Sequence, residues 1–200
     1  MPKQIKLEHV ISFSDAIFAF SITFMAITIQ IPDLPENLTQ TQVIDILLGQ
    51  TSHFAIYVIS FFVIGIYWIS YHQIFSHITE SRGAMIWLNL LFLFSITLIS
   101  FAFDLQVQYG FYYIIFAIYA SILTLSGALL TIIWLHAKKN GLIEDTLKST
   151  DIQSLTVQSV LTPSVFALSI LISIINVQIA YYFWLVIIPA KIVIHKRYPY

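Results

Sequence analysis

The side chains with the clearest capacity for chemistry are an aspartate and histidines in otherwise apolar segments. Asp15 stands near the start of the apolar stretch 9–31. A charged carboxylate near the centre of a membrane costs about 2.5–3.5 kcal/mol on insertion scales. We therefore interpret Asp15 either as an ion or proton site or as a buried anchor that hydrogen-bonds to neighbouring helices. His72 and His77 are five positions apart, and no HExxH motif occurs, so we expect neither a metal site nor an enzyme.

The composition is that of an integral membrane protein. Of its 200 residues, 58% are hydrophobic and 10% are charged, whereas soluble domains carry about 25% charged residues. The net charge of −1 gives no indication of a nucleic-acid partner. The absence of cysteine excludes disulfides, zinc thiolates and cysteine nucleophiles. The N-terminal apolar run is long and lacks a small-residue cleavage site, so we expect a retained helix and not a signal peptide.

Apolar runs separated by polar breaks predict six transmembrane helices in one domain, residues 1–200, of an all-α polytopic membrane protein. A span needs about 20 apolar residues. The expected helices cover about 9–31, 43–76, 83–103, 110–137, 152–175 and 178–195. All nine Lys and Arg residues fall on one side of this arrangement. Because cytoplasmic loops carry the excess of basic residues, both termini are predicted to be cytoplasmic.

The first helix carries two lines of side chains when its residues are placed about 100° apart. The small or polar line consists of Ser12, Ala16, Ala19, Thr23, Ala26 and Gln30, and the bulky line consists of Phe20, Phe24, Ile27 and Ile31. Small residues favour close helix packing, and a bulky line suits a lipid-facing surface. Alternatively, this helix lines a pore, where the bulky line forms a hydrophobic constriction and the Thr23 hydroxyl contacts an ion.

Asp15 lies about 140° from Phe20 around the helix, which favours the anchor over the ion site. Its partners are then expected among polar groups of the next two helices. Indole N–H groups, a histidine and an amide can all donate to a carboxylate. The candidates are Trp68, His72, Trp87 and Asn89.

Three strings, FSDAIFAFSIT, YWISYHQIF and WLNLLFLFSITLISF, resemble the bacterial members of the transmembrane protein 175 family. Eukaryotic members of that family are endolysosomal potassium channels. The resemblance implies a homotetramer in the cell membrane of a bacterium, with one six-helix unit per chain and a central pore lined by the first helix. It places the main constriction at Phe20, potassium preference at Thr23, where a potassium ion would bind transiently, and further layers at Phe24 and Ile27.

Two positions depart from the family pattern. His9 stands where the family usually has an arginine that braces the first helix, and Phe20 stands where Ile or Leu is usual. A histidine is only partly charged near neutral pH, so bracing, gating or pH response can differ. The predicted bracing network comprises His9, Ser14, Asp15, Trp68, His72, Trp87 and Asn89.

The sequence thus predicts a passive, potassium-selective cation channel that needs no cofactor and has itself and membrane lipid as partners. The alternative is a proton- or cation-coupled secondary transporter that uses Asp15 and the histidines of the second and third helices. Such a carrier is expected to have broken helices and several charges at the membrane midplane. The only acidic candidates are Asp15 and Asp104.

Overall fold

Long apolar helices make up most of the chain. The computed structural model describes residues 5–29, 34–81 and 83–197. Its helices are α1 (Leu7–Thr28), α2 (Gln40–Gly49), α3 (Thr51–Phe75), α4 (Ala84–Tyr109), α5 (Tyr113–Lys139), α6 (Ser149–Ile175), α7 (Val177–Phe183) and α8 (Ile187–Arg197). Six segments are long and apolar enough to cross a membrane, namely α1, α3, α4, α5, α6 and the continuous stretch Val177–Ile194. The prediction of an all-α, multi-pass membrane protein is confirmed.

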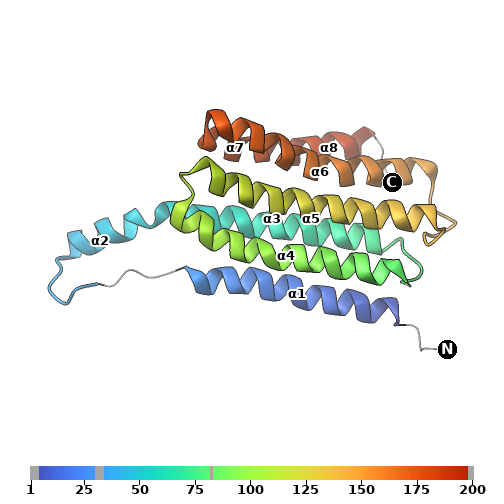
Figure 1. Cartoon of the computed structure of the whole chain (residues 1–200), viewed down its shortest axis with the longest axis horizontal. Helices are drawn as coiled ribbons and strands as arrows, with labels where there is room; N and C mark the ends of the chain where they lie inside the picture. Colours follow the sequence, from blue (N-terminus) through green and yellow to red (C-terminus); the bar gives the residue numbers. More distant parts are fainter. Residues whose placement is uncertain (1–4, 30–33, 82, 198–200) are drawn as a thin grey trace.

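The helix predicted over 43–76 is in fact two helices, α2 and α3. Thr39 and Gln42 form a capping box, in which each side chain bonds the backbone of the other residue, and this starts a separate helix. At Gln50 the backbone N–H turns back to the Leu47 carbonyl at 3.0 Å, which ends α2 before α3 begins. No residue of α2 is buried, and this helix extends beyond the bundle (Figure 1).

The helix predicted over 178–195 is interrupted by a 3-10 turn at Trp184–Val186, which separates α7 from α8. Pro189 follows in the first turn of α8. Proline has no backbone N–H, so the carbonyl four residues earlier receives no helical hydrogen bond. Proline chemistry thus accounts for a break that apolar content alone does not indicate.

The helices pack in an order that leaves α1 at one edge of the bundle. α5 packs against α4 and α6, α1 packs mainly against α4 and less against α3, and α7 and α8 pack against α6. Figure 1 shows α1 on one side of the bundle and α6, α7 and α8 on the other. One long face of α1 is consequently free of contacts with the other described helices.

Helices α5 and α6 approach each other closely where Gly127 faces Pro163. A Cβ atom at Gly127 would lie 2.9 Å from the proline ring, so only glycine allows this approach. Pro163 cannot donate to the Ser159 carbonyl, four residues earlier. The Thr131 hydroxyl of α5 donates to that carbonyl at 2.7 Å. Within a membrane a freed backbone carbonyl needs such a partner, so α6 continues through its proline.

The loop between α3 and α4 is bonded to the loop between α5 and α6. A single antiparallel bridge joins Ile78 to Ile143, and the Thr79 N–H donates to the Leu142 carbonyl at 2.8 Å. The start of α1 and the end of α8 lie at this same end of the bundle (Figure 1). Lys138, Lys139 and Lys148, around the loop between α5 and α6, therefore lie at the same end of the bundle as the start of α1.

Candidate functional site

Helix α1 has one buried face and one exposed face. The buried face consists of Val10, Ser14, Phe18, Ser21 and Met25. The exposed face includes the bulky line, with Phe20 60%, Phe24 41% and Ile27 79% exposed. Ile31, the fourth predicted member of that line, and Gln30 lie outside the described residues. Neither line predicted from the sequence contains any of these five buried residues, although Ser14 was predicted to belong to the bracing network.

The small line of α1 is also exposed. Ser12, Ala16, Ala19, Thr23 and Ala26 all lie on the surface of the chain. These residues therefore do not serve close packing against other described helices of the same chain. The contiguous face that they form with the bulky line is available to other copies of the chain, to lipid or to a pore.

On this face the hydroxyl oxygen of Thr23 lies next to the aromatic ring of Phe20. The Thr23 hydroxyl donates to the carbonyls of Ala19, at 2.9 Å, and Phe20, at 3.0 Å. Because its proton is directed at the helix backbone, its oxygen lone pairs remain free for a cation. The rings of Phe20 and Phe24 stack with centroids 5.6 Å apart, which makes them one apolar layer.

Ser14 is the point at which α1 is joined to two other helices. Its buried hydroxyl lies 2.8 Å from both the Val10 carbonyl and the Tyr71 hydroxyl, and it accepts from the Asn89 amide at 3.1 Å. Ser14 has a single proton, which the Val10 carbonyl accepts, so Tyr71 must be the donor in the second bond. One oxygen therefore connects α1 with α3 and α4.

Asp15 contacts two of its four predicted partners. The Trp68 indole Nε1 donates to Asp15 Oδ1 at 2.8 Å, and His72 Nε2 lies 3.3 Å from the same oxygen. The His72 Nδ1 atom is 3.2 Å from the Trp68 carbonyl, which orients the imidazole ring. The Asp15 side chain is 43% exposed in the single chain. Asp15 is thus bonded to α3 as predicted, and its carboxylate is partly open in the single chain, not buried as the anchor interpretation expected.

The remaining predicted members of the bracing network do not reach Asp15. Asn89 is buried but bonds to Ser14, and its own Oδ1 atom has no partner among the described residues. Trp87 is 68% exposed, and within residues 5–29, 34–81 and 83–197 its indole makes no hydrogen bond. His9 is likewise exposed, and its side chain has no bonding partner in the described part of the chain. Two separate bonded groups therefore join α1 to its neighbours: Asp15 with Trp68 and His72, and Ser14 with Tyr71 and Asn89.

Sequence reasoning did not identify Tyr71 or Ser100. Tyr71 is fully buried and stacks on Phe75 and Phe92, with ring centroids 4.0 Å and 5.7 Å away. The Ser100 hydroxyl of α4 donates to the Ser21 carbonyl of α1 at 3.0 Å. A usable signal was the four-residue spacing of Tyr67, Tyr71 and Phe75, which puts three aromatic rings on one face of α3.

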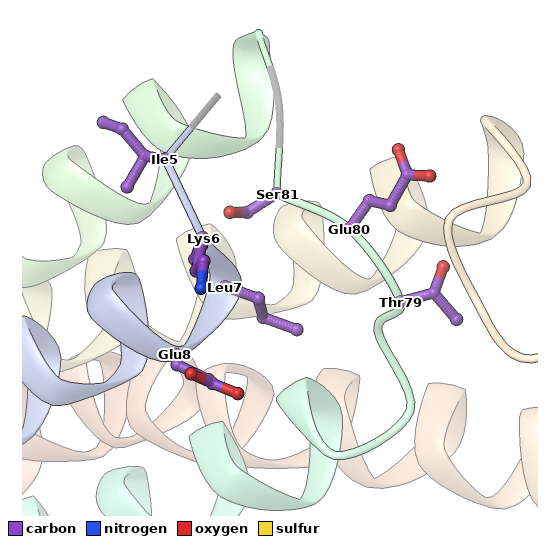
Figure 2. A pocket seen from close by; sticks show the side chains of 7 residues that line it. All are labelled: Ile5, Lys6, Leu7, Glu8, Thr79, Glu80 and Ser81. Atoms are coloured by element: carbon purple, nitrogen blue, oxygen red, sulfur yellow. The ribbon is translucent and has the colours of Figure 1, made fainter. Parts of the chain in front are cut away.

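A cavity of about 430 Å³ lies where the start of α1 meets the loop between α3 and α4. Figure 2 shows that the side chains of Thr79 and Glu80 point away from Lys6 and Glu8. The charged groups around this cavity do not converge on one point. Across the described residues, moreover, no cluster of three or more His, Cys, Asp or Glu side chains could hold a metal ion.

Comparison with known proteins gives a consistent set of relatives. Residues 9–99 match the family model described as the endosomal/lysosomal potassium channel TMEM175. A potassium channel of Streptomyces collinus is 30% identical over 140 residues, which are 67% of this chain and 66% of that protein. A potassium channel of Chamaesiphon minutus is 23% identical over 184 residues, 90% of each chain. The chain thus spans about two thirds of the first relative and nine tenths of the second.

Two solved structures are similar in fold. One is the crystal structure of a lysosomal potassium-selective channel TMEM175 homolog from Chamaesiphon minutus, with a TM-score of 0.79 and 22% identity. The match covers 97% of this chain and 98% of that one. The other is a variant of the potassium channel MtTMEM175, with a TM-score of 0.65, 17% identity and coverage of 98% and 93%.

Proposed function

The chain belongs to the TMEM175 family of potassium channels, and from this premise we propose that it is a passive cation channel that prefers potassium to sodium. Its relatives are channels and not enzymes, so no catalytic activity is assigned to it. They also give no support to the alternative of a coupled secondary transporter that uses Asp15 and the histidines. The protein crosses the membrane several times; its placement in the cell membrane of a bacterium, with both termini cytoplasmic, is part of the proposal.

The observation that carries the proposal is the exposed face of α1. Three large apolar side chains, Phe20, Phe24 and Ile27, lie on the surface of a helix at the edge of the bundle. A homotetramer of single six-helix units, arranged around a fourfold axis next to α1, would bring four copies of this face together. Lipid contact alone would not account for the small side chains and the Thr23 hydroxyl on the same face.

In the proposed pore, Phe20 forms the constriction, with Phe24 and Ile27 as adjoining layers and Ile31 as a further predicted one. Four phenyl side chains around an axis would exclude water when they are close together, and such constrictions gate by dewetting. Thr23 lies three residues farther along, so four hydroxyl oxygens would replace part of the hydration shell of a potassium ion. The only charged residue between Val10 and Ile29 is Asp15, which is engaged by Trp68 and His72.

The anchors of α1 support this assignment because they determine which face is free. Ser14 is bonded to α3 and α4, and Asp15 is bonded to α3. Rotating a helix by one residue moves its side chains about 100°, which would break these bonds and remove Phe20 and Thr23 from the free face. We therefore assign Asp15 and Ser14 a positioning role, and the ion-contacting role to Thr23.

A liposome flux assay tests the proposal. Purified protein is reconstituted in vesicles with a potassium, sodium or proton gradient, and the movement of each ion is recorded without the others. We expect potassium to move passively down its gradient and faster than sodium. Potassium movement that requires a fixed number of counter-moving protons would instead establish a coupled carrier.

A further inference from the structure

Lys191 is a cation inside the last apolar segment and has no anionic partner among the described residues. It lies on α8, six residues before the end of that helix at Arg197. Its Nζ atom donates to the Ser70 hydroxyl of α3 at 2.9 Å. An ammonium group has three N–H donors and a full charge, and Ser70 accepts one bond and carries no charge. No carboxylate of the described residues forms an ion pair with Lys191.

A cavity of about 520 Å³ opens beside Lys191, between α3, α6 and α8. Its polar lining consists of Lys191 and Lys196 from α8, Gln73 from α3 and Gln158 from α6. The Gln73 side-chain amide makes no hydrogen bond to any residue that the structure describes, so its N–H groups are free to donate. Two ammonium groups and an amide donor around one cavity are complementary to a phosphate group.

An apolar groove of about 280 Å³ continues from this cavity toward the middle of the span, and Ile66 lines both. The groove is bordered by Ile59 and Phe62 of α3 and by Leu185 and Ile188 of the last segment. From Tyr181, which also lines the groove, to Lys196 the segment rises about 22 Å, at about 1.5 Å per residue. This is about half of the roughly 40–45 Å that a bilayer spans with its headgroup regions, so the cavity and groove together match the depth of one leaflet.

We propose that the cavity and groove between α3, α6 and α8 bind an anionic phospholipid. Its phosphate lies between Lys191 and Lys196 with the Gln73 amide as a further donor, and an acyl chain occupies the groove. Basic pockets between transmembrane helices commonly hold anionic headgroups. Figure 1 shows α8 on the side of the bundle away from α1, so the site faces lipid when α1 faces other copies. The binding does not depend on conduction.

A neighbouring carboxylate limits the size of the headgroup. Asp151 and His77 line a smaller cavity of about 210 Å³ that shares Gln73 with the proposed site. A second phosphate placed toward Asp151 would be repelled. A headgroup with one phosphate and a neutral alcohol, such as phosphatidylglycerol, therefore fits better than one with several phosphates.

Lipid retention measured by native mass spectrometry tests the proposal. The detergent-purified protein is titrated with phosphatidylglycerol or with phosphatidylcholine of the same chains, each with and without inorganic phosphate. We expect phosphatidylglycerol to be retained and phosphatidylcholine to be retained much less. Each lysine should contribute about fivefold to the affinity, so the double variant Lys191→Gln/Lys196→Gln should bind at least about tenfold more weakly.

Matched controls separate this site from general attraction of lipid to basic protein. Lys138→Gln/Lys139→Gln removes the same charge from the exposed end of α5 and should leave retention unchanged. Lys196→Gln, at an exposed position, provides a single variant that does not disturb packing and should weaken binding about fivefold. Equal retention by the double variant and the wild type, equal retention of the two lipids, or displacement by inorganic phosphate would each overturn the proposal.

Discussion

Replacing Ser14 by alanine should destabilise the protein far more than removing the Tyr71 hydroxyl that bonds to it. In Ser14→Ala, the Tyr71 hydroxyl and the Asn89 amide lose their acceptor while both residues stay buried, at 0% and 2% exposure. In Tyr71→Phe, the donor disappears together with its bond, and Ser14 keeps the bond from Asn89. The two variants should differ in stability because Ser14 accepts hydrogen bonds from both Tyr71 and Asn89.

The expected magnitudes come from counting unpaired buried donors. Leaving a buried polar group unsatisfied costs about 1–3 kcal/mol, so Ser14→Ala should lose about 2–6 kcal/mol for its two donors. Tyr71→Phe should lose about 0.5–1.5 kcal/mol, and the low end is favoured because hydrogen bonds between membrane helices average about 0.6 kcal/mol. The double variant has one unpaired donor in place of two, so it should be more stable than Ser14→Ala alone by about 1–3 kcal/mol.

Unfolding free energies from SDS titration in mixed micelles provide the assay, with Ser12→Ala as the control. Ser12 is exposed on the same helix and makes no side-chain hydrogen bond to the described residues, so its replacement should stay within about 0.5 kcal/mol of wild type. The decisive result is whether the unfolding free energy of the double variant is higher or lower than that of Ser14→Ala alone. A double variant less stable than Ser14→Ala, or a Tyr71→Phe loss as large as that of Ser14→Ala, would refute the reasoning.

Three further outcomes are expected. Thr23→Ala should lower the preference for potassium over sodium because it removes the free hydroxyl oxygen from the exposed face of α1, and an unchanged reversal potential in mixed-ion solutions would exclude that role. Asp15→Asn should fold with a loss of about 1 kcal/mol, since an amide oxygen still accepts from Trp68, and should keep its ion selectivity; a stably assembled variant with altered selectivity in flux measurements would mean that Asp15 contacts the ion. Gly127→Ala should lose about 1–3 kcal/mol through overlap with Pro163, whereas Gly65→Ala, with open space around it, should gain up to about 1 kcal/mol; equal melting temperatures for the two would exclude close packing at Gly127.

Hydrophobic length was sufficient to predict the membrane class and the number of spans. Periodicity along α1 grouped its residues into lines, because a helix places residues at regular angles whatever it packs against, but it did not show that both lines lie on the exposed surface. The breaks at Gln50 and at Trp184–Val186 were missed because they depend on local hydrogen bonding. The capping box at Thr39 was a readable signal for the start of α2, and the proline at position 189 was one for the break at Trp184–Val186.

The anchor of α1 could be predicted only in part. The sequence correctly predicted that Asp15 contacts Trp68 and His72. These two residues lie four positions apart, on one face of α3. Trp87 and Asn89 differ by two positions, or about 200° around α4, so they could not both face α1. Which of the two does so depends on the rotation of α4, and that is determined by packing between helices far apart in the sequence.

The central claim is that the exposed face of α1 lines the ion pathway, and modification of an introduced cysteine tests it most directly. The natural chain has no cysteine, so Thr23→Cys and the control Leu171→Cys each carry one thiol. Leu171 is 63% exposed on α6, away from α1. A small cationic thiol reagent should block potassium flux through Thr23→Cys and leave Leu171→Cys unchanged. Complete modification of Thr23→Cys without loss of flux would contradict the claim.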